Sequence, residues 1–178
     1  MRRFFPDGRD VLPSRPYKFR EVAYSAMTTE ESVVVDVPVR TAYNQWTQFE
    51  DFPRFMSGVE RVVQIDDTHN HWVTKVGGVR REFDTRITEQ RPDERIAWTT
   101  EEGEVRQSGV VTFHRLDETH TKVMVQLDMQ PQGVTEQAAD KLDVVTKQTE
   151  ADLRRFKDFI EARGAETGAW REEVDRPN

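Results

Sequence analysis

Apolar positions between residues 135 and 163 recur every three or four residues. This spacing is typical of one face of an α-helix, and charged residues occupy the positions between. Gly164 follows Arg163 where helices often end in a left-handed residue. The pattern therefore predicts one long amphipathic helix that needs a partner surface. Its inward series is Ala138, Leu142, Val145, Thr149, Leu153, Phe156 and Ile160.

The chain before this helix has the pattern of strands. Residues 32–37 are rich in β-branched side chains, and six more apolar segments follow, separated by turn residues at hairpin spacing. Short connections favour antiparallel pairing, so we expect a sheet of about seven strands. The six later strands are expected at 59–66, 71–76, 81–90, 95–100, 105–116 and 120–130.

Two short helices are expected between the first and second strands. Pro38 ends the first strand and is tolerated in a first helical turn, and apolar residues follow with helical spacing up to Trp46. The aromatic segment 49–56 predicts a second short helix or turn that anchors against the core. A curved sheet closed over by the long helix would bury both apolar faces, which predicts an α+β fold.

The ends of the chain differ from this domain. Residues 1–30 contain prolines and arginines without a helix or strand period, which favours a flexible arm. Two alternatives stay open: Met27 is the natural start, or aromatic residues of the arm dock on the domain or on a partner. Residues 31–164 are predicted to form one domain, followed by a polar surface tail at 165–178.

Composition narrows the classes of function. The chain has 178 residues and a net charge of −7, and this negative charge argues against nucleic acid as a partner. It contains no cysteine, which excludes disulfides and thiolate metal sites. No apolar run has the length of a membrane span, so we expect a soluble, cytoplasmic protein without an integral membrane segment.

Neither a metal nor another cofactor is expected. His69 and His71 flank a predicted hairpin tip, His120 lies in the last turn, and His114 is expected to point outward from its strand. No triad order, phosphate-binding glycine loop or paired-carboxylate signature stands out.

The element order and several segments resemble the START/Bet v 1-like (SRPBCC) superfamily, specifically its polyketide cyclase/dehydrase family. That resemblance implies a helix-grip fold, in which a curved sheet wraps around the long C-terminal helix and leaves a hydrophobic cavity between them. The matching residues are 33–38 (VVVDVP), Trp46, 49–55 (FEDFPRF), 109–113 (GVVTF), 127–131 (LDMQP) and 149–163.

The resemblance implies that a small hydrophobic or aromatic ligand, lipid- or polyketide-like, binds in this cavity. Ordinary core packing is the alternative for each aromatic residue taken singly, but ligand pockets are mostly apolar. The expected ligand-binding residues are Phe52, Phe55, Trp72, Phe83, Trp98 and Phe113, with Ala138, Leu142 and Val145 from the smaller half of the helix stripe.

A polyketide cyclase/dehydrase activity of the aromatase type is the enzyme alternative. In such members a pocket arginine polarises a carbonyl, and Arg86 aligns with it. Strand alternation instead places Arg86 on the other face of its strand from Phe83 and Ile87. This favours a solvent-exposed charge paired with Glu82 or Asp84. A third hypothesis is a protein-interaction module that recognises a partner through residues 1–26.

Overall fold

The computed structural model describes residues 28–129 and 137–176, with side chains of the last helix described from Asp140 onward. None of the helices in these two ranges is long and apolar enough to cross a membrane. The elements are β1 (Thr28–Val35), α2 (Val39–Trp46), the 3-10 helix η1 (Phe49–Arg54), β2 (Val59–Gln64), β3 (His69–Val76), β4 (Val79–Arg91), β5 (Arg95–Gly103), β6 (Gln107–Asp117), β7 (His120–Met129) and α3 (Gln137–Arg163).

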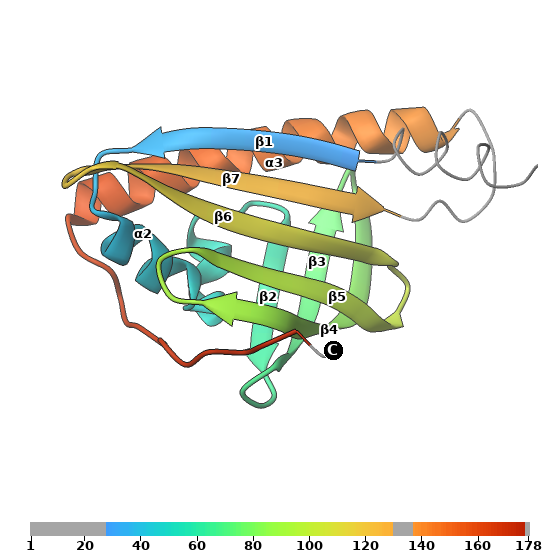
Figure 1. Cartoon of the computed structure of the whole chain (residues 1–178). Coiled ribbons are helices and arrows are strands. Elements are labelled where there is room, and N and C mark those ends of the chain that lie inside the picture. The colour runs from blue at the N-terminus through green and yellow to red at the C-terminus, as the bar shows by residue number, and fades with distance from the viewer. Residues whose placement is uncertain (1–27, 130–136, 177–178) are drawn as a thin grey trace, which may run out of the picture.

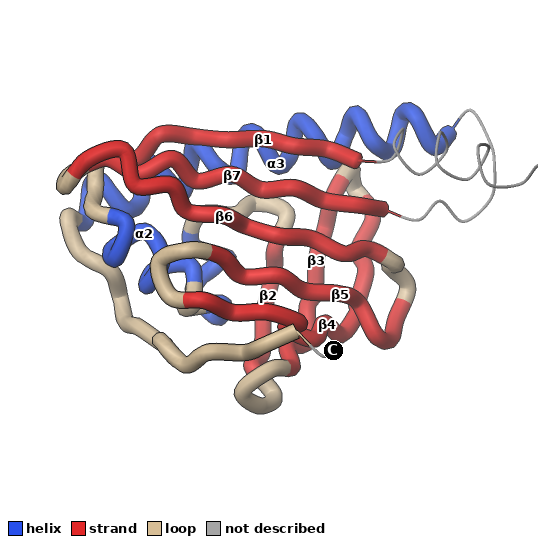
Figure 2. The backbone as a smooth tube through the Cα atoms, in the orientation of Figure 1, coloured by secondary structure: helices blue, strands red, loops and turns tan. Residues whose placement is uncertain are grey.

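Seven strands form one antiparallel sheet in the order β1-β7-β6-β5-β4-β3-β2. The sheet curves so strongly that β2 and β3 run across the direction of β5, β6 and β7 (Figure 1). Helix α3 runs alongside β1, and α2 lies at one end of the sheet (Figure 2). The α+β helix-grip fold, with two short helices after the first strand and a long C-terminal helix, is confirmed.

The first strand begins earlier than the sequence pattern predicts. Thr28 pairs with Asp128 of β7, and its hydroxyl donates to the Asp128 carboxylate at 2.6 Å. Residues 28–30 therefore belong to the sheet and not to the arm, because backbone pairing with β7 extends the strand over polar residues. Residues 1–27, with the possible partner segment 1–26, lie outside the described residues.

The predicted hairpin tip around the histidines is displaced toward Asp66. The Asp66 carboxylate accepts hydrogen bonds from the backbone N–H groups of Thr68 and His69, at 2.9 and 2.8 Å, and so forms the turn. His69 is consequently a strand residue of β3, which begins two residues before the predicted start at His71. His114 is exposed, as predicted.

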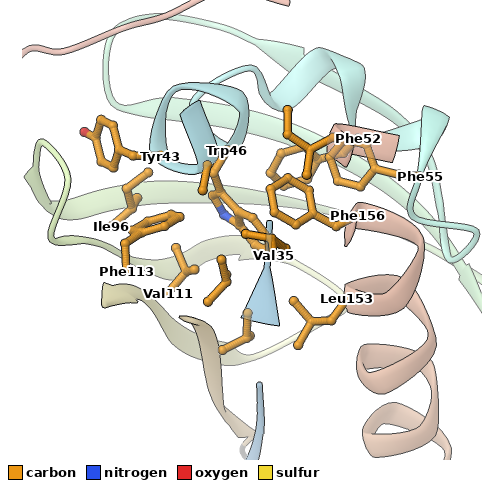
Figure 3. Close-up of a cluster of buried hydrophobic side chains, with 14 of the residues drawn as sticks. Val35, Tyr43, Trp46, Phe52, Phe55, Ile96, Val111, Phe113, Leu153 and Phe156 are labelled. Carbon is orange, nitrogen blue, oxygen red and sulfur yellow. The ribbon is translucent and has the colours of Figure 1, made fainter. Parts of the chain in front are cut away.

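The core lies at the end of the sheet covered by α2 and η1 (Figure 3). Phe156 of α3 is fully buried, with ring centroids 5.2 Å from Trp46 and 5.3 Å from Phe55. Phe113 of β6 packs edge-on against Tyr43 at 5.4 Å. The C-terminal half of α3 is thus held by aromatic packing, and its N-terminal half is left for a different role.

The segment after Gly164 packs along the domain. Val174 pairs with Gln90 at the edge of β4, and Figure 1 shows this segment running past α2 toward β4. Arg171 binds Asp93 through two N–O contacts of 2.8 and 2.9 Å and lies over the ring of Tyr43. The polar tail therefore follows the surface, fixed by ion pairs.

Candidate ligand-binding cavity

A cavity of about 590 Å³ lies between the inner face of the sheet and the N-terminal half of α3. It begins where the aromatic core ends, since Trp46, Phe52 and Leu153 line it and also belong to the core. Strands β2 to β7 and the loop between β5 and β6 supply the rest of the wall. The fold places this space between a curved sheet and a helix that closes it at one end only.

Two stacked aromatic rings form part of the sheet wall. Trp72 and Phe83 are paired across β3 and β4, and their rings are parallel within 6° at a centroid distance of 6.3 Å. The indole N–H of Trp72 donates to the Thr85 hydroxyl at 2.8 Å, so this polar group is satisfied inside the wall. The wall presents flat apolar surface to a ligand.

Trp98 occupies its place because the residue opposite has no side chain. It pairs with Gly109 of β6, and a Cβ atom at that glycine would lie 2.4 Å from the indole ring. Leu127 of β7 also approaches this position and lines the cavity. Gly109 therefore lets the indole lie flat against the sheet, which keeps the cavity open above it.

The helix wall is made of small and medium side chains. Val144, Val145, Gln148 and Thr149 line the cavity. The Thr149 hydroxyl donates to the carbonyl of Val145 at 2.8 Å, so it is satisfied within the helix and leaves the wall less polar. The bulkier Phe156 and Ile160 are fully buried in the core beyond the cavity.

The cavity opens to solvent at the turn between β3 and β4. Gly77 and Gly78 form this turn with φ of 58° and 80°, a conformation that favours glycine. The lining residues Val79 and Val144 are 49% and 42% exposed, which marks the opening. The charged residues at this end are Arg81, Glu104, Arg106, Asp140 and Lys141.

Asp152 is a buried carboxyl group in the helix wall, with 8% of the residue exposed. Its Oδ1 accepts from the backbone N–H of Ser57 at 3.1 Å and from Gln148 at 2.9 Å, and it lies 3.1 Å from Arg155. Burial raises the pKa of Asp152, and the hydrogen bonds with the Arg155 charge partly oppose this.

The predicted ligand-binding residues divide between cavity and core. Leu142 is half-buried but does not line the cavity, and the side chain of Ala138 lies outside the described residues. Phe55 and Phe113 are buried in the aromatic core, because η1 and α2 pack over them. Of the predicted residues, those that line the cavity are Phe52, Trp72, Phe83, Trp98 and Val145.

Arg86 lies on the outer face of the sheet, where its Nε is 2.7 Å from the Glu101 carboxylate. It does not line the cavity, and its ion pair is with β5 instead of Glu82 or Asp84. The arginine of β4 that lines the cavity is Arg81, which shares the inner face with Phe83. Counting back by twos from Phe83 would have found it in the sequence.

The described histidines lie outside the cavity lining. His71 is 2.6 Å from Asp84, and His69 lies 2.9 Å from Asp66 and 3.3 Å from Glu101. Within residues 28–129 and 137–176, no three His, Asp or Glu side chains are grouped to hold a metal ion.

Residues 35–158 match the family model described as "Polyketide cyclase / dehydrase and lipid transport". A relative in Streptomyces lincolnensis, described as an uncharacterized 17.2 kDa protein in the melC2-rnhH intergenic region, is 67% identical over 142 residues, covering 80% of this chain and 95% of the relative.

Solved structures that share this fold include an aromatase/cyclase and a START superfamily protein. The Zhui aromatase/cyclase of a Streptomyces species is 18% identical with a TM-score of 0.65, covering 80% of this chain and 98% of that one. A START superfamily protein of Mycobacterium smegmatis is 14% identical with a TM-score of 0.59, covering 72% of this chain and 97% of that one.

Proposed function

Because the chain belongs to the polyketide cyclase/dehydrase and lipid transport family of the START/Bet v 1-like superfamily, we propose that it binds a small, largely apolar, lipid- or polyketide-like molecule in the cavity beside α3. Binding or carriage of this ligand, without strong intrinsic catalysis, is the function that the geometry supports best.

The cavity itself carries this proposal. Its volume of about 590 Å³ is within the usual range of small-molecule sites, roughly 300–1,000 Å³. Aromatic and aliphatic residues make up most of its wall, and the polar groups of Trp72, Thr85 and Thr149 already have partners. An apolar ligand would remove this surface from water without leaving these three groups unsatisfied.

Native mass spectrometry of gently purified protein, followed by solvent extraction, tests the proposal. We expect a retained apolar molecule, or saturable binding of the neutral dye Nile red. Trp46, Trp72 and Trp98 line the cavity, so binding should also change their fluorescence. Protein that is repeatedly empty and binds neither Nile red nor any of a panel of apolar compounds would refute the proposal.

Cyclisation or dehydration of a poly-β-keto chain is the second candidate. The observation that favours it is that a cation, Arg81 of the sheet wall, and a buried carboxyl group, Asp152 of the helix wall, line the same cavity. A guanidinium group can stabilise developing oxyanion charge, and a carboxyl group of raised pKa can transfer a proton. The test is product formation from a poly-β-keto thioester: Asp152→Asn should keep ligand binding and lose turnover. No turnover by the unaltered protein would remove this candidate.

A further inference from the structure

We propose that the ligand is an amphiphile with an anionic head group, and that Arg81 binds this head group at the opening of the cavity. The inference rests on the ligand-binding function proposed above and adds the chemical class of the ligand. The apolar part would lie along the aromatic wall, and the charge would stay at the solvent-facing end.

The backbone of β4 directs Arg81 inward. Alternate residues of a strand share one face, and Phe83 and Thr85, two and four positions further on, are buried in the cavity wall. Arg81 pairs with Thr74 of β3, which also lines the cavity. Arg81 is therefore part of the wall, in contrast to Arg86 on the outer face.

Arg81 is partly buried and has no counter-ion among the described residues, since no carboxylate lies within 4.0 Å of it. A partly desolvated cation without a partner is unfavourable, and a carboxylate or phosphate would supply two oxygen acceptors. The other described arginines without a carboxylate partner are all exposed: Arg40, Arg61, Arg106, Arg115 and Arg163.

The surrounding charges favour an anion at this end. Arg106 and Lys141 join Arg81 in the lining, against the carboxylates of Glu104 and Asp140. The Glu104 carboxylate already has a partner in β4, because its Oε2 accepts a hydrogen bond from the backbone N–H of Glu82 at 3.3 Å. Asp140 lies in the first turn of α3, where the helix dipole offsets negative charge.

Among the described residues, the rest of the wall offers no second cation for the head group. Its aromatic part holds only neutral polar groups, such as the Thr85 hydroxyl that accepts from Trp72. The remaining charged residue of the described lining is Asp152, whose carboxyl group offers no positive charge to an anion. A single orientation follows, with the head at Arg81 and the apolar tail inward.

Three ligands with one alkyl chain test the proposal: dodecanoate, dodecyl phosphate and neutral dodecanol, each measured by displacement of Nile red below its micelle concentration. The variant is Arg81→Met, which keeps the length of the side chain and removes the charge. Arg61→Met is the matched control, because Arg61 is exposed, has no carboxylate within 4.0 Å among the described residues and does not line the cavity.

In the unaltered protein we expect at least one anionic ligand to bind roughly tenfold more tightly than dodecanol. Arg81→Met should remove this difference and leave dodecanol affinity unchanged, whereas Arg61→Met should change neither. The better of the two anions identifies the head group as carboxylate or phosphate. Raising the salt concentration should weaken the preference for the anion.

Equal binding of all three ligands, or an anion preference that survives Arg81→Met, would overturn this inference and leave the cavity function standing. Failure of all three ligands and of Nile red would refute the proposed function itself. The two failures are therefore distinguishable in one series of titrations.

Discussion

Arg86 and Glu101 form an ion pair across β4 and β5 on the outer face of the sheet, with 2.7 Å between Nε and Oε1. Both side chains are partly exposed, at 42% and 38%. We expect Arg86→Ala to leave ligand affinity and any turnover unchanged and to alter stability by less than about 1 kcal/mol. Titration with Nile red and urea unfolding would check this. A large loss of turnover would restore Arg86 as a catalytic candidate.

Filling the cavity from the helix side should block the ligand. Val145 lines the cavity, so Val145→Trp is expected to lower the affinity for Nile red at least tenfold, because the indole occupies ligand space. Val63→Trp is the control, since Val63 is 38% exposed on β2 and does not line the cavity. Unchanged affinity in Val145→Trp would mean that the ligand binds elsewhere.

The far half of the same helix should govern stability instead of affinity. Phe156 is fully buried between Trp46 and Phe55, so Phe156→Ala should lower the free energy of unfolding by about 3–5 kcal/mol. Urea unfolding measures this, and Phe156→Leu gives a milder variant if the alanine form does not fold. The control is Leu116→Ala: Leu116 is 55% exposed, so this change should lower the free energy of unfolding by less than about 0.5 kcal/mol. Similar losses at both positions would contradict the packing argument.

The buried carboxyl group of Asp152 should make stability depend on pH. Its pKa is raised in the folded protein by burial, so the folded state holds the proton more tightly than the unfolded state. The stability that this group contributes is fully present below its unfolded pKa and is lost as pH rises through the folded pKa.

Asp152→Asn removes this titration, so its stability relative to the unaltered protein should increase as pH rises above the ordinary range of an aspartate. Urea unfolding at a series of acidic to neutral pH values would measure the difference. The exposed Asp158 on the same helix provides the control Asp158→Asn. A relative stability that falls with pH would show that the contacts of Arg155, Gln148 and Ser57 outweigh burial.

The C-terminal segment should contribute measurably to stability through Arg171. Replacing it with methionine removes both contacts to Asp93 and the charge over the Tyr43 ring, and should cost roughly 1 kcal/mol. Urea unfolding checks this against Arg115→Met, at an exposed arginine. Equal stability of the two variants would mean that the tail adds nothing to the domain.

Local patterns in the sequence were enough to predict the elements and their arrangement. The helical period ending at Arg163, the strand alternation and the position of Pro38 are properties of neighbouring residues, and α2, α3 and the seven strands follow from them. Strand ends were less certain, because β1 extends to Thr28 through its pairing with Asp128, which lies 100 residues away.

The candidate site was predictable only in part. Alternation along β4 already separated Arg86 from Phe83, but it took the paired strands to place Arg81 beside Thr74 in the wall. Phe52 and Phe113 look alike in the sequence, yet the first lines the cavity and the second does not. Sequence period assigns a side chain to a face and does not tell whether that face is packed or open.

By itself the sequence determined an α+β fold of about seven antiparallel strands and one long helix, since hydrophobic period, turns and chain order are local properties. The resemblance to a known family added the helix-grip arrangement. The tertiary structure decided where the interior is filled. Aromatic residues from η1 and α2 pack against Phe156, whereas the smaller Val145 and the indole of Trp98, which Gly109 admits, line the cavity. The cavity is left because packing density depends on contacts between distant segments, which no single stretch of the sequence contains.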